Sequence, residues 1–381
     1  MALAKKAGGY DIDLMRDMKR AQEKFGVSLS KQVMDFMAVR SLGLSFEEYL
    51  YFALFNKPRS DYSAYMGNNR ARAAFYIAND LTTWDAAEDK LNFAATMAAA
   101  ELPNPRIVAF AHLDRDAGGA AVLRTRGAVE EWLQTCSLPV FGKPAIASHG
   151  DGSVHITGRE GDNLLLADGA SVKVGDLAAD IETYTDEAGF LFQEVLTPHR
   201  DIAAITDDRL ATARFFVLRE AEGGGVRDVV LRLPAGKNRV DNFRRDGNLV
   251  APVDIDTGAI GVAVRGVGVA REAMRRHPDT NEAIENVTLP DFQAAKSIVT
   301  AAAECFPQQH IQSWDVAFTD SGPSLLEVNP GGNFNILQLA SGRGVFDPAF
   351  RKFLEARLSE KSSADTDQKA LKEAKKLLKL K

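Results

Sequence analysis

Near the C-terminal end of the sequence, two carboxylates and one amide stand at a spacing that suits a metal ion: Asp315, Glu327 and Asn329. Side chains on a strand alternate between its two faces, so Glu327 and Asn329 point the same way, about 7 Å apart. A hairpin through the Ser-Gly turn at 321–322 would bring Asp315 back beside them. Magnesium prefers such oxygen ligands, completed by phosphate oxygens and water. The alternative is an edge hairpin whose acids are only solvated.

A site for phosphate groups also needs cations and backbone N–H groups. Lys143 ends the run 139–143, and a glycine-rich turn follows at 148–152. A lysine on a strand beside such a turn can place a positive charge and several N–H donors around phosphates. A plain hairpin turn would explain the glycines equally well. The turn matches neither the P-loop pattern nor the dinucleotide-binding pattern, so those two sites are not predicted.

Two further basic residues are candidates for the same site. Lys90 opens a helix that a Leu-Pro-Asn-Pro segment ends, and a surface helix pair is the alternative interpretation for it. Arg214 lies inside the apolar strand 212–218. An unpaired buried charge is costly, so Arg214 either pairs with an acid or faces a site.

The elements that must position these residues change in character along the chain. Residues 1–85 carry apolar side chains at helical spacing, and Ser45 with Glu48 matches a capping box, so this region is predicted to be mostly helical. A further helix is predicted over 85–100. Beyond it, short β-rich runs alternate with Gly, Asp and Ser clusters. Strands are predicted over 107–111, 139–143, 163–166, 190–194, 212–218, 226–233, 249–255, 260–264, 311–318 and 324–329, with a hairpin turn at 256–258 and helices over 127–135, 289–305 and 346–358.

These runs predict an α+β protein in which a helical N-terminal region precedes two β-rich lobes. We divide the chain into residues 1–85, a first lobe at 86–195, a second lobe at 196–359 and a charged tail at 360–381. For the tail, a solvated helix or frayed end is favoured over a membrane-surface or partner helix.

Bulk properties exclude several classes of protein. The 381 residues favour two or three domains or lobes around one site, and the net charge of −6 argues against a nucleic-acid surface. The two cysteines have no metal-ligand spacing and exclude a disulfide framework. No run approaches the roughly 20 apolar residues that span a bilayer. We therefore predict a cytoplasmic enzyme that binds neither nucleic acid nor membrane.

In their order along the chain, these pieces resemble the ATP-grasp superfamily. The resemblance is closest to its sugar-transfer-associated branch and looser to its glutamate-ligase-like members. It covers roughly residues 85 to 345 and implies the ATP-grasp fold, in which two β-rich lobes hold ATP between them, with Lys90 and Lys143 on the α- and β-phosphates. The other nucleotide ligands it implies are Ser148, Gly150 and Gly152 in a phosphate-covering loop, Gln193, Glu194 and Leu196 at the hinge between the lobes, and Asp201 for the ribose, where Glu194 and His199 are alternatives.

The same resemblance implies roles around the γ-phosphate. Two Mg²⁺ ions would share Glu327, with Asp315 on one ion and Asn329 on the other. Arg214 would act in catalysis together with Lys143, by meeting the transferring phosphoryl group and stabilising an oxyanion. The family often carries an arginine two residues before the first metal acid, where this sequence has Ser313. The residues implied to bind the carboxylate substrate are Asn242, Gly331 and Gly332.

The activity that follows from the resemblance is an ATP-dependent ligase. It would join a small-molecule carboxylate to an amine, less often a thiol, through an acyl phosphate, with release of ADP and phosphate. One alternative is a phosphotransferase on the same fold, and another is a nucleotide-binding regulatory protein that has lost turnover. A homodimer is left open as the assembly.

Overall fold

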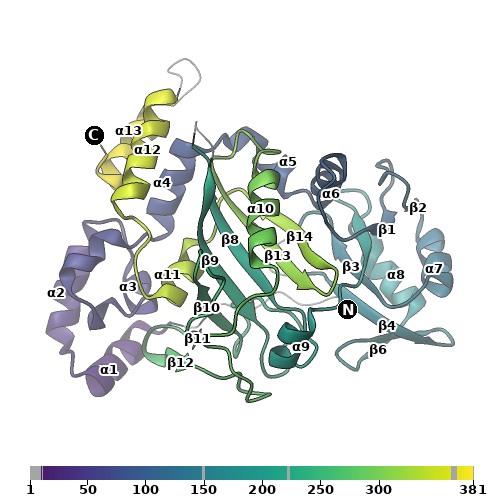
Figure 1. The fold of residues 1–381 in the computed structure, drawn as a ribbon, viewed down its shortest axis with the longest axis horizontal. Helices are drawn as coiled ribbons and strands as arrows, with labels where there is room; N and C mark the ends of the chain where they lie inside the picture. The colour runs from purple at the N-terminus through teal and green to yellow at the C-terminus, as the bar shows by residue number, and fades with distance from the viewer. Residues whose placement is uncertain (1–9, 11, 148–150, 221–223, 362–366, 381) are drawn as a thin grey trace.

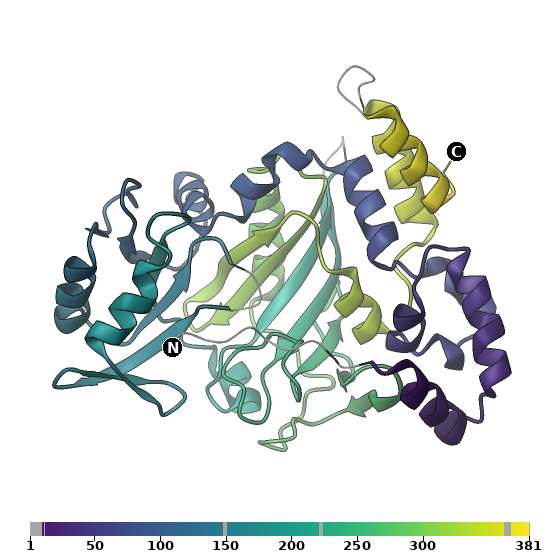
Figure 2. The ribbon, with the colours of Figure 1, turned by 180° about the vertical axis from the view of Figure 1, so that it is seen from behind.

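The computed structural model describes residues 10, 12–147, 151–220, 224–361 and 367–380, and its strands form two seven-stranded sheets. We call them sheet A, built from residues between 107 and 194, and sheet B, built from residues between 212 and 329. Sheet B occupies the middle of the molecule, with sheet A on one side and the first helices of the chain on the other (Figure 1 and Figure 2). The predicted α+β class is confirmed.

Sheet A has the order β2-β1-β7-β3-β4-β5-β6, with β1 and β2 parallel and the other neighbours antiparallel. On one face, apolar side chains such as Phe190 and Phe192 pack against helices α7 (Arg126–Thr135) and α8 (Val174–Glu182). The other face looks toward sheet B. The strands are β1 (Ile107–Ala111), β2 (Ala121–Leu123), β3 (Val140–Pro144), β4 (Val154–Glu160), β5 (Asn163–Leu166), β6 (Ser171–Lys173) and β7 (Phe190–Glu194).

Sheet B is antiparallel throughout, with the order β12-β11-β10-β9-β8-β13-β14. Helix α10 (Phe292–Ala303) packs on one face over side chains such as Phe215 and Trp314. On the opposite face, other helices cover an apolar part that includes Phe216 and Val230, which leaves a charged part of that face open. The strands are β8 (Thr212–Leu218), β9 (Gly225–Leu233), β10 (Leu249–Val253), β11 (Ala263–Arg265), β12 (Glu272–Met274), β13 (Ile311–Thr319) and β14 (Gly322–Asn329).

The N-terminal region is helical, as predicted. Ser45 and Glu48 form the predicted capping box at the start of α3, in which each residue accepts a backbone N–H of the other. Fully buried aromatic side chains such as Tyr49 and Tyr62 form a separate small core here. The elements are α1 (Leu14–Phe25), α2 (Leu29–Arg40), α3 (Phe46–Tyr51), α4 (Asn68–Ala78) and the 3-10 turns Leu54–Asn56, Arg59–Ala64 and Leu81–Thr83, with a further 3-10 turn at Gly268–Ala270.

The single helix predicted over 85–100 is wrong: the structure has two helices, α5 (Trp84–Glu88) and α6 (Lys90–Ala99). Asp89 separates them, because its backbone is extended and its carboxylate accepts the N–H groups of Leu91 and Asn92. A short acidic side chain competes in this way for the N–H groups that an uninterrupted helix would use. The break makes Lys90 the first residue of α6.

The charged tail also differs from its prediction as a solvated or frayed segment. Helices α12 (Pro348–Glu360) and α13 (Gln368–Leu378) both pack against α4. Ala374 and Leu378 of α13 are buried in the same core as Phe350, because the apolar residues of this lysine-rich helix fall on one side. None of the helices in the described part of the chain combines the length and apolar composition needed to cross a membrane.

Most other predicted elements are present, several of them with boundaries shifted by two or three residues. The strand predicted over 249–255 ends at Val253, because the Asp254 carboxylate accepts the N–H groups of Asp256 and Thr257 and forms the predicted turn. The strand predicted over 260–264 begins only at Ala263. Elements that the sequence analysis did not predict include β2, β4, β6, α8, α11 (Phe334–Ser341) and α9 (Arg200–Thr206).

A candidate active site between the two sheets

Sheets A and B face each other across a cleft of 1090 Å³. Sites for a single small molecule enclose roughly 300–1,000 Å³, so this cleft has room for more than one ligand. Its lining includes the open faces of the two sheets, the segment 239–244 between β9 and β10, and residues of α3, α4 and α11.

The predicted carboxylate hairpin is present on sheet B. In the register of β13 and β14, Asp315 lies opposite Glu327 and Ser313 lies opposite Asn329. The Asn329 side-chain amide donates to Glu327 Oε1 at 3.3 Å. Asp315, Glu327 and Asn329 all line the cleft, so the strand alternation and the hairpin bring them together as expected.

Asp315 is 2 % exposed, and both of its oxygens accept hydrogen bonds from guanidinium groups. Arg214 donates from Nε at 2.6 Å and from Nη2 at 2.7 Å, and Arg232 donates from Nη2 at 2.8 Å. Burial acts to raise the pKa of Asp315, but the two guanidinium groups outweigh it and hold that pKa well below its ordinary value. The prediction that Arg214 pairs with an acid or faces a site is confirmed on both counts.

Arg232 was not among the predicted site residues. It reaches over Thr212 to Asp315, and its Nε lies 3.5 Å from Asp241, which itself accepts from the Thr212 N–H at 2.9 Å. Burial acts to lower the pKa of Arg232, and the carboxylates of Asp241 and Asp315 outweigh it and raise that pKa. The sequence signal was the one that identified Arg214: Arg232 stands inside the apolar run of β9.

The opposite side of the cleft carries two lysines, Lys143 on β3 of sheet A and Lys90 at the start of α6. Lys90 donates from Nζ to the Ala147 carbonyl at 2.7 Å, and Lys143 makes no hydrogen bond or ion pair with any described residue. Burial, and secondarily the charge of Lys90, lower the pKa of Lys143 to about 8. Neither ammonium group has a carboxylate of the described residues within ion-pair distance, which leaves a positive potential that a polyphosphate would offset.

The residues predicted at the hinge between the lobes lie at the end of β7 and just beyond it. Gln193, Glu194 and Leu196 all line the cleft. The Gln193 amide donates to the Pro105 carbonyl at 3.3 Å, and Glu194 Oε1 accepts the Arg106 N–H at 3.0 Å. The segment before β1 therefore fixes both side chains.

Asp201, the residue predicted for the ribose, lies away from the cleft. It stands in the first turn of α9, its side chain is mostly exposed, and its carboxylate lies 3.6 Å from His199 Nδ1. The residues that line the cleft include Glu194 but neither Asp201 nor His199. Of the three residues predicted as alternatives for the ribose, Glu194 is the one that lines the cleft.

The glycines predicted to bind substrate have structural explanations of their own. Gly331 packs against the Trp84 ring, where a Cβ atom would lie 2.4 Å from a ring carbon. Gly332 has a φ of 52°, and its N–H donates to the Asn329 carbonyl at 3.3 Å. Both stand outside the cleft lining, whereas Asn242, the other predicted substrate residue, belongs to it.

The phosphate-covering loop can be described only in part. Gly152 has a φ of 74° and lies against Pro144 and Tyr184, and its neighbours Asp151 and Ser153 line the cleft. Ser148 and Gly150 lie outside the described residues.

The segment 239–244, which we call the arginine loop because Arg239 and Arg244 stand at its two ends, lines the cleft with all six of its residues. Its shape depends on Asn248, which is fully buried. Asn248 Oδ1 accepts from the Ala235 N–H and the Asn238 side-chain amide, each at 2.9 Å. Its Nδ2 donates to the carbonyls of residues 240 and 242, each at 2.8 Å. One side chain thereby fixes a loop that has no regular secondary structure.

The donor set fits magnesium that is bound together with phosphate. Among the described residues, no group of three or more acids, histidines or cysteines could hold a metal ion alone. Glu327 is partly exposed to the cleft and Asn329 lies beside it, while Asp315 would reach an ion only by sharing an oxygen with Arg214 or Arg232. Magnesium commonly takes one or two carboxylates and fills its other positions with phosphate oxygens and water.

Several solved structures resemble this fold at low identity. A biotin carboxylase–β-γ-ATP complex from Campylobacter jejuni has a TM-score of 0.43 and 9 % identity over 80 % of this chain and 55 % of its own. The D-Ala:D-Ser ligase VanG from Enterococcus faecalis has a TM-score of 0.40 and 12 % identity over 74 % and 63 %. N5-carboxyaminoimidazole synthase from Aspergillus clavatus, in complex with ADP and 5-aminoimidazole ribonucleotide, has a TM-score of 0.39 and 10 % identity. The match covers 71 % of this chain and 54 % of that protein. The chain thus spans less than two thirds of each of these proteins.

None of the curated proteins compared with the sequence matches it. The model of one protein family, described as sugar-transfer associated ATP-grasp, matches residues 72–352. That match covers well over half of the sequence and includes both sheets, both lysines and the carboxylate hairpin. The chain therefore belongs to the sugar-transfer associated ATP-grasp family and has the ATP-grasp fold.

Proposed function

We propose that the protein is an ATP-dependent ligase that activates a carboxylate as an acyl phosphate. The observation that supports it most directly is the arrangement of charge across the cleft. Lys90 of α6 and Lys143 of sheet A line one side of it, while Arg214, Glu327 and Asn329 line it from sheet B. A triphosphate held by the lysines would extend its γ-phosphate toward the sheet B residues.

In the proposed reaction, a carboxylate oxygen of the substrate attacks the γ-phosphorus and the bond to the β–γ bridging oxygen breaks, so ADP leaves. An amine then attacks the acyl carbon, phosphate leaves with the bonding electrons, and the amine nitrogen loses a proton to solvent. Magnesium, when bound, offsets the charge on the transferring phosphoryl group.

The side chains of sheet B have distinct parts in this proposal. Glu327 and Asn329 would supply oxygen ligands for magnesium beside the γ-phosphate. The guanidinium of Arg214, held by two hydrogen bonds to Asp315, is fixed in position before substrate binds. A preorganised donor of this kind stabilises developing negative charge without the cost of reorientation.

The test uses purified protein with ATP, Mg²⁺ and panels of uronic acids, hydroxy acids and amino acids, with hydroxylamine as the general nucleophile. An acyl phosphate reacts with hydroxylamine to give a hydroxamate, so the expected result is carboxylate-dependent release of ADP and phosphate together with hydroxamate. A stable phosphorylated product without phosphate release would instead establish a phosphotransferase. ATP binding without turnover across all panels would contradict the proposal.

A further inference from the structure

The cleft extends from the two sheets to the helices at the start of the chain. Its far end, which we call the acceptor end, is formed by Tyr51 of α3, Asn68 of α4, Asn335 of α11, and Phe243 with Arg244 of the arginine loop. Residues 51 and 68 precede the region matched by the family model, so this part of the cleft depends on the helices at the start of the chain.

The acceptor end is held together by Glu48, which lines the cleft together with Glu47. The Glu48 carboxylate accepts the Ser45 N–H at 2.8 Å and the Asn68 N–H at 2.6 Å, which joins α3 to the start of α4. The Asn335 amide donates to Asn68 Oδ1 at 3.4 Å. Two amides from different helices therefore meet at one place and present their remaining donors and acceptors to the cleft.

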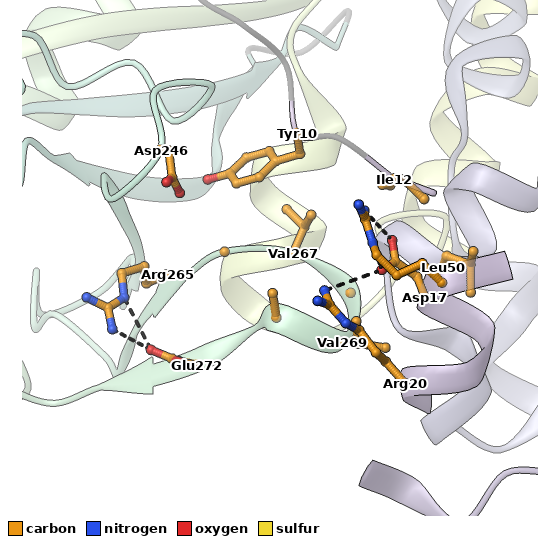
Figure 3. A pocket seen from close by; sticks show the side chains of 14 residues that line it. Tyr10, Ile12, Asp17, Arg20, Leu50, Asp246, Arg265, Val267, Val269 and Glu272 are labelled. Carbon is orange, nitrogen blue, oxygen red and sulfur yellow. Dashed lines mark hydrogen bonds and ion pairs between the residues drawn. The ribbon is translucent and has the colours of Figure 1, made fainter. Parts of the chain in front are cut away.

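Tyr10 closes this end of the cleft. Its ring centroid lies 5.1 Å from that of Phe243 and 6.4 Å from that of Tyr51, so it connects the arginine loop to α3. On its other side is a smaller pocket of 200 Å³ (Figure 3). The three arginines that line this smaller pocket are all paired: Arg265 with Glu272, and Arg16 and Arg20 with Asp17.

The arginine loop, in contrast, carries charge that no acid neutralises. Neither Arg239 nor Arg244 has a carboxylate within ion-pair distance among the described residues, although both are exposed in the cleft. Burial, with a smaller contribution from Arg239, lowers the pKa of His155 on sheet A. Burial raises the pKa of Tyr51 to about 12, and Arg244 acts against that rise. Arg239 is thus near His155 of sheet A, and Arg244 is near Tyr51 at the acceptor end.

We infer that the acceptor end binds a substrate other than ATP, and that this substrate is a sugar carrying a carboxylate or phosphate group. Arg244 would bind the anionic group by charge-assisted hydrogen bonds. The amides of Asn68 and Asn335 suit hydroxyl groups, which both donate and accept. The partly exposed ring of Tyr51 offers flat apolar surface to the C–H face of a pyranose ring. The inference rests on the proposed function only in assigning the other half of the cleft to ATP.

The test is ligand-observed saturation-transfer NMR on the full chain, saturated with a non-hydrolysable ATP analogue and Mg²⁺ so that the nucleotide half is occupied. The probes are D-glucuronate, D-glucose 6-phosphate, D-glucose, acetate and inorganic phosphate. We expect both anionic sugars to bind and to bind more tightly than glucose, acetate or inorganic phosphate. The better of the two sugars identifies the anionic group.

Arg244→Gln should lower the affinity for both anionic sugars at least about tenfold, because one charged hydrogen bond is lost. Their affinity should then be close to that of glucose. Arg72→Gln is the matched control, since Arg72 is an exposed arginine of α4 outside the cleft lining. Asn68→Ala should lower the affinity for glucose and for the anionic sugars by a similar factor. A loss of charge alone would lower only the affinity for the anionic sugars.

Calorimetric titration of the ATP analogue separates this inference from the proposed function. If the analogue binds normally but neither sugar does, the acceptor assignment is wrong and the nucleotide assignment stands. If acetate or phosphate binds as tightly as the sugars, or if Arg244→Gln leaves their affinity unchanged, the inference is overturned. Failure of the analogue to bind would count against the proposed function, whereas sugar binding that depends on Arg244 would still support the acceptor end.

Discussion

The two sides of the cleft treat buried positive charge in opposite ways. On sheet A, Lys143 forms no hydrogen bond or ion pair with any described residue, and its pKa falls to about 8. On sheet B, Arg214 and Arg232 are fixed by hydrogen bonds and ion pairs to Asp315 and Asp241. One side leaves a cation uncompensated, and the other encloses its cations in a network of acids.

The difference separates two uses of charge in one site. An uncompensated ammonium costs stability, but it provides a strong attraction for an incoming anion. A paired guanidinium offers less net charge, but its position is fixed, since the acids around it restrict its rotamers. In the proposed function, sheet A would serve affinity for the phosphates, and sheet B would serve geometry at the γ-phosphate. Four experiments would break or sharpen this distinction.

The largest effect is expected at Glu327. Glu327→Gln keeps the shape of the side chain but removes the charge that a metal ion needs, so Mg²⁺-dependent turnover should fall to background. Asn329→Ala should lower this turnover less, because the amide is a neutral ligand. Thermal unfolding should change little in either variant, since Glu327 is partly exposed at a cleft. Wild-type turnover in Glu327→Gln would remove this residue from the metal site.

The second experiment compares Arg232→Met with Lys143→Met by urea unfolding. Arg232→Met should lower the free energy of unfolding by about 3 kcal/mol, because breaking a buried ion pair leaves Asp241 without its guanidinium. Lys143→Met should leave that free energy unchanged or raise it, because it removes an unpaired buried charge. Equal losses in the two variants would show that sheets A and B do not differ in this respect.

The third experiment measures nucleotide affinity. Lys143→Ala should raise the Kd for ATP at least about tenfold, which corresponds to one charged hydrogen bond at roughly 1.5–3 kcal/mol. Lys143→Arg should restore only part of the affinity, since a planar guanidinium fits phosphate differently from a compact ammonium. Calorimetric titration provides the measurement. Unchanged affinity in Lys143→Ala would mean that the lysine is structural.

The smallest effect concerns protons. Because the pKa of Lys143 is lowered to about 8 in the free protein, the ammonium begins to lose its proton near that pH. Bound phosphates favour the charged form and raise the pKa, so ATP binding should take up a fraction of a proton at pH 8 and almost none at pH 6.5. ATP affinity should accordingly weaken as the pH rises through 8. Titrations in buffers of different ionisation enthalpy measure the uptake, and Lys143→Met should abolish it.

The sequence predicted those parts of the site that depend on local pattern. Strand alternation and one turn are enough to bring Asp315, Glu327 and Asn329 together, and the cost of a buried charge is enough to single out Arg214. The same reasoning would have identified Arg232, which stands in a similar apolar run. Its partners could not be predicted, because the contact with Asp315 depends on the order of three strands in sheet B.

The acceptor end lay beyond prediction for a related reason. Tyr51, Asn68 and Asn335 are far apart in the sequence, and only packing of the helical region against sheet B brings them to one place. The fate of the tail was equally non-local, because whether a lysine-rich helix is solvated depends on a partner such as α4. Asp201 was matched only by its order along the chain, and none of the residues of α9 lines the cleft.

Asn248 has a consequence for how the specificity of this protein can change over evolutionary time. Apart from the Asn238 side chain, it contacts only backbone groups, so it fixes the course of the arginine loop without reference to most of the side chains there. Substitutions at 239, 243 or 244 would alter what the loop recognises while its path stays the same. A lineage could therefore acquire a new acceptor through single changes on a loop whose shape is inherited.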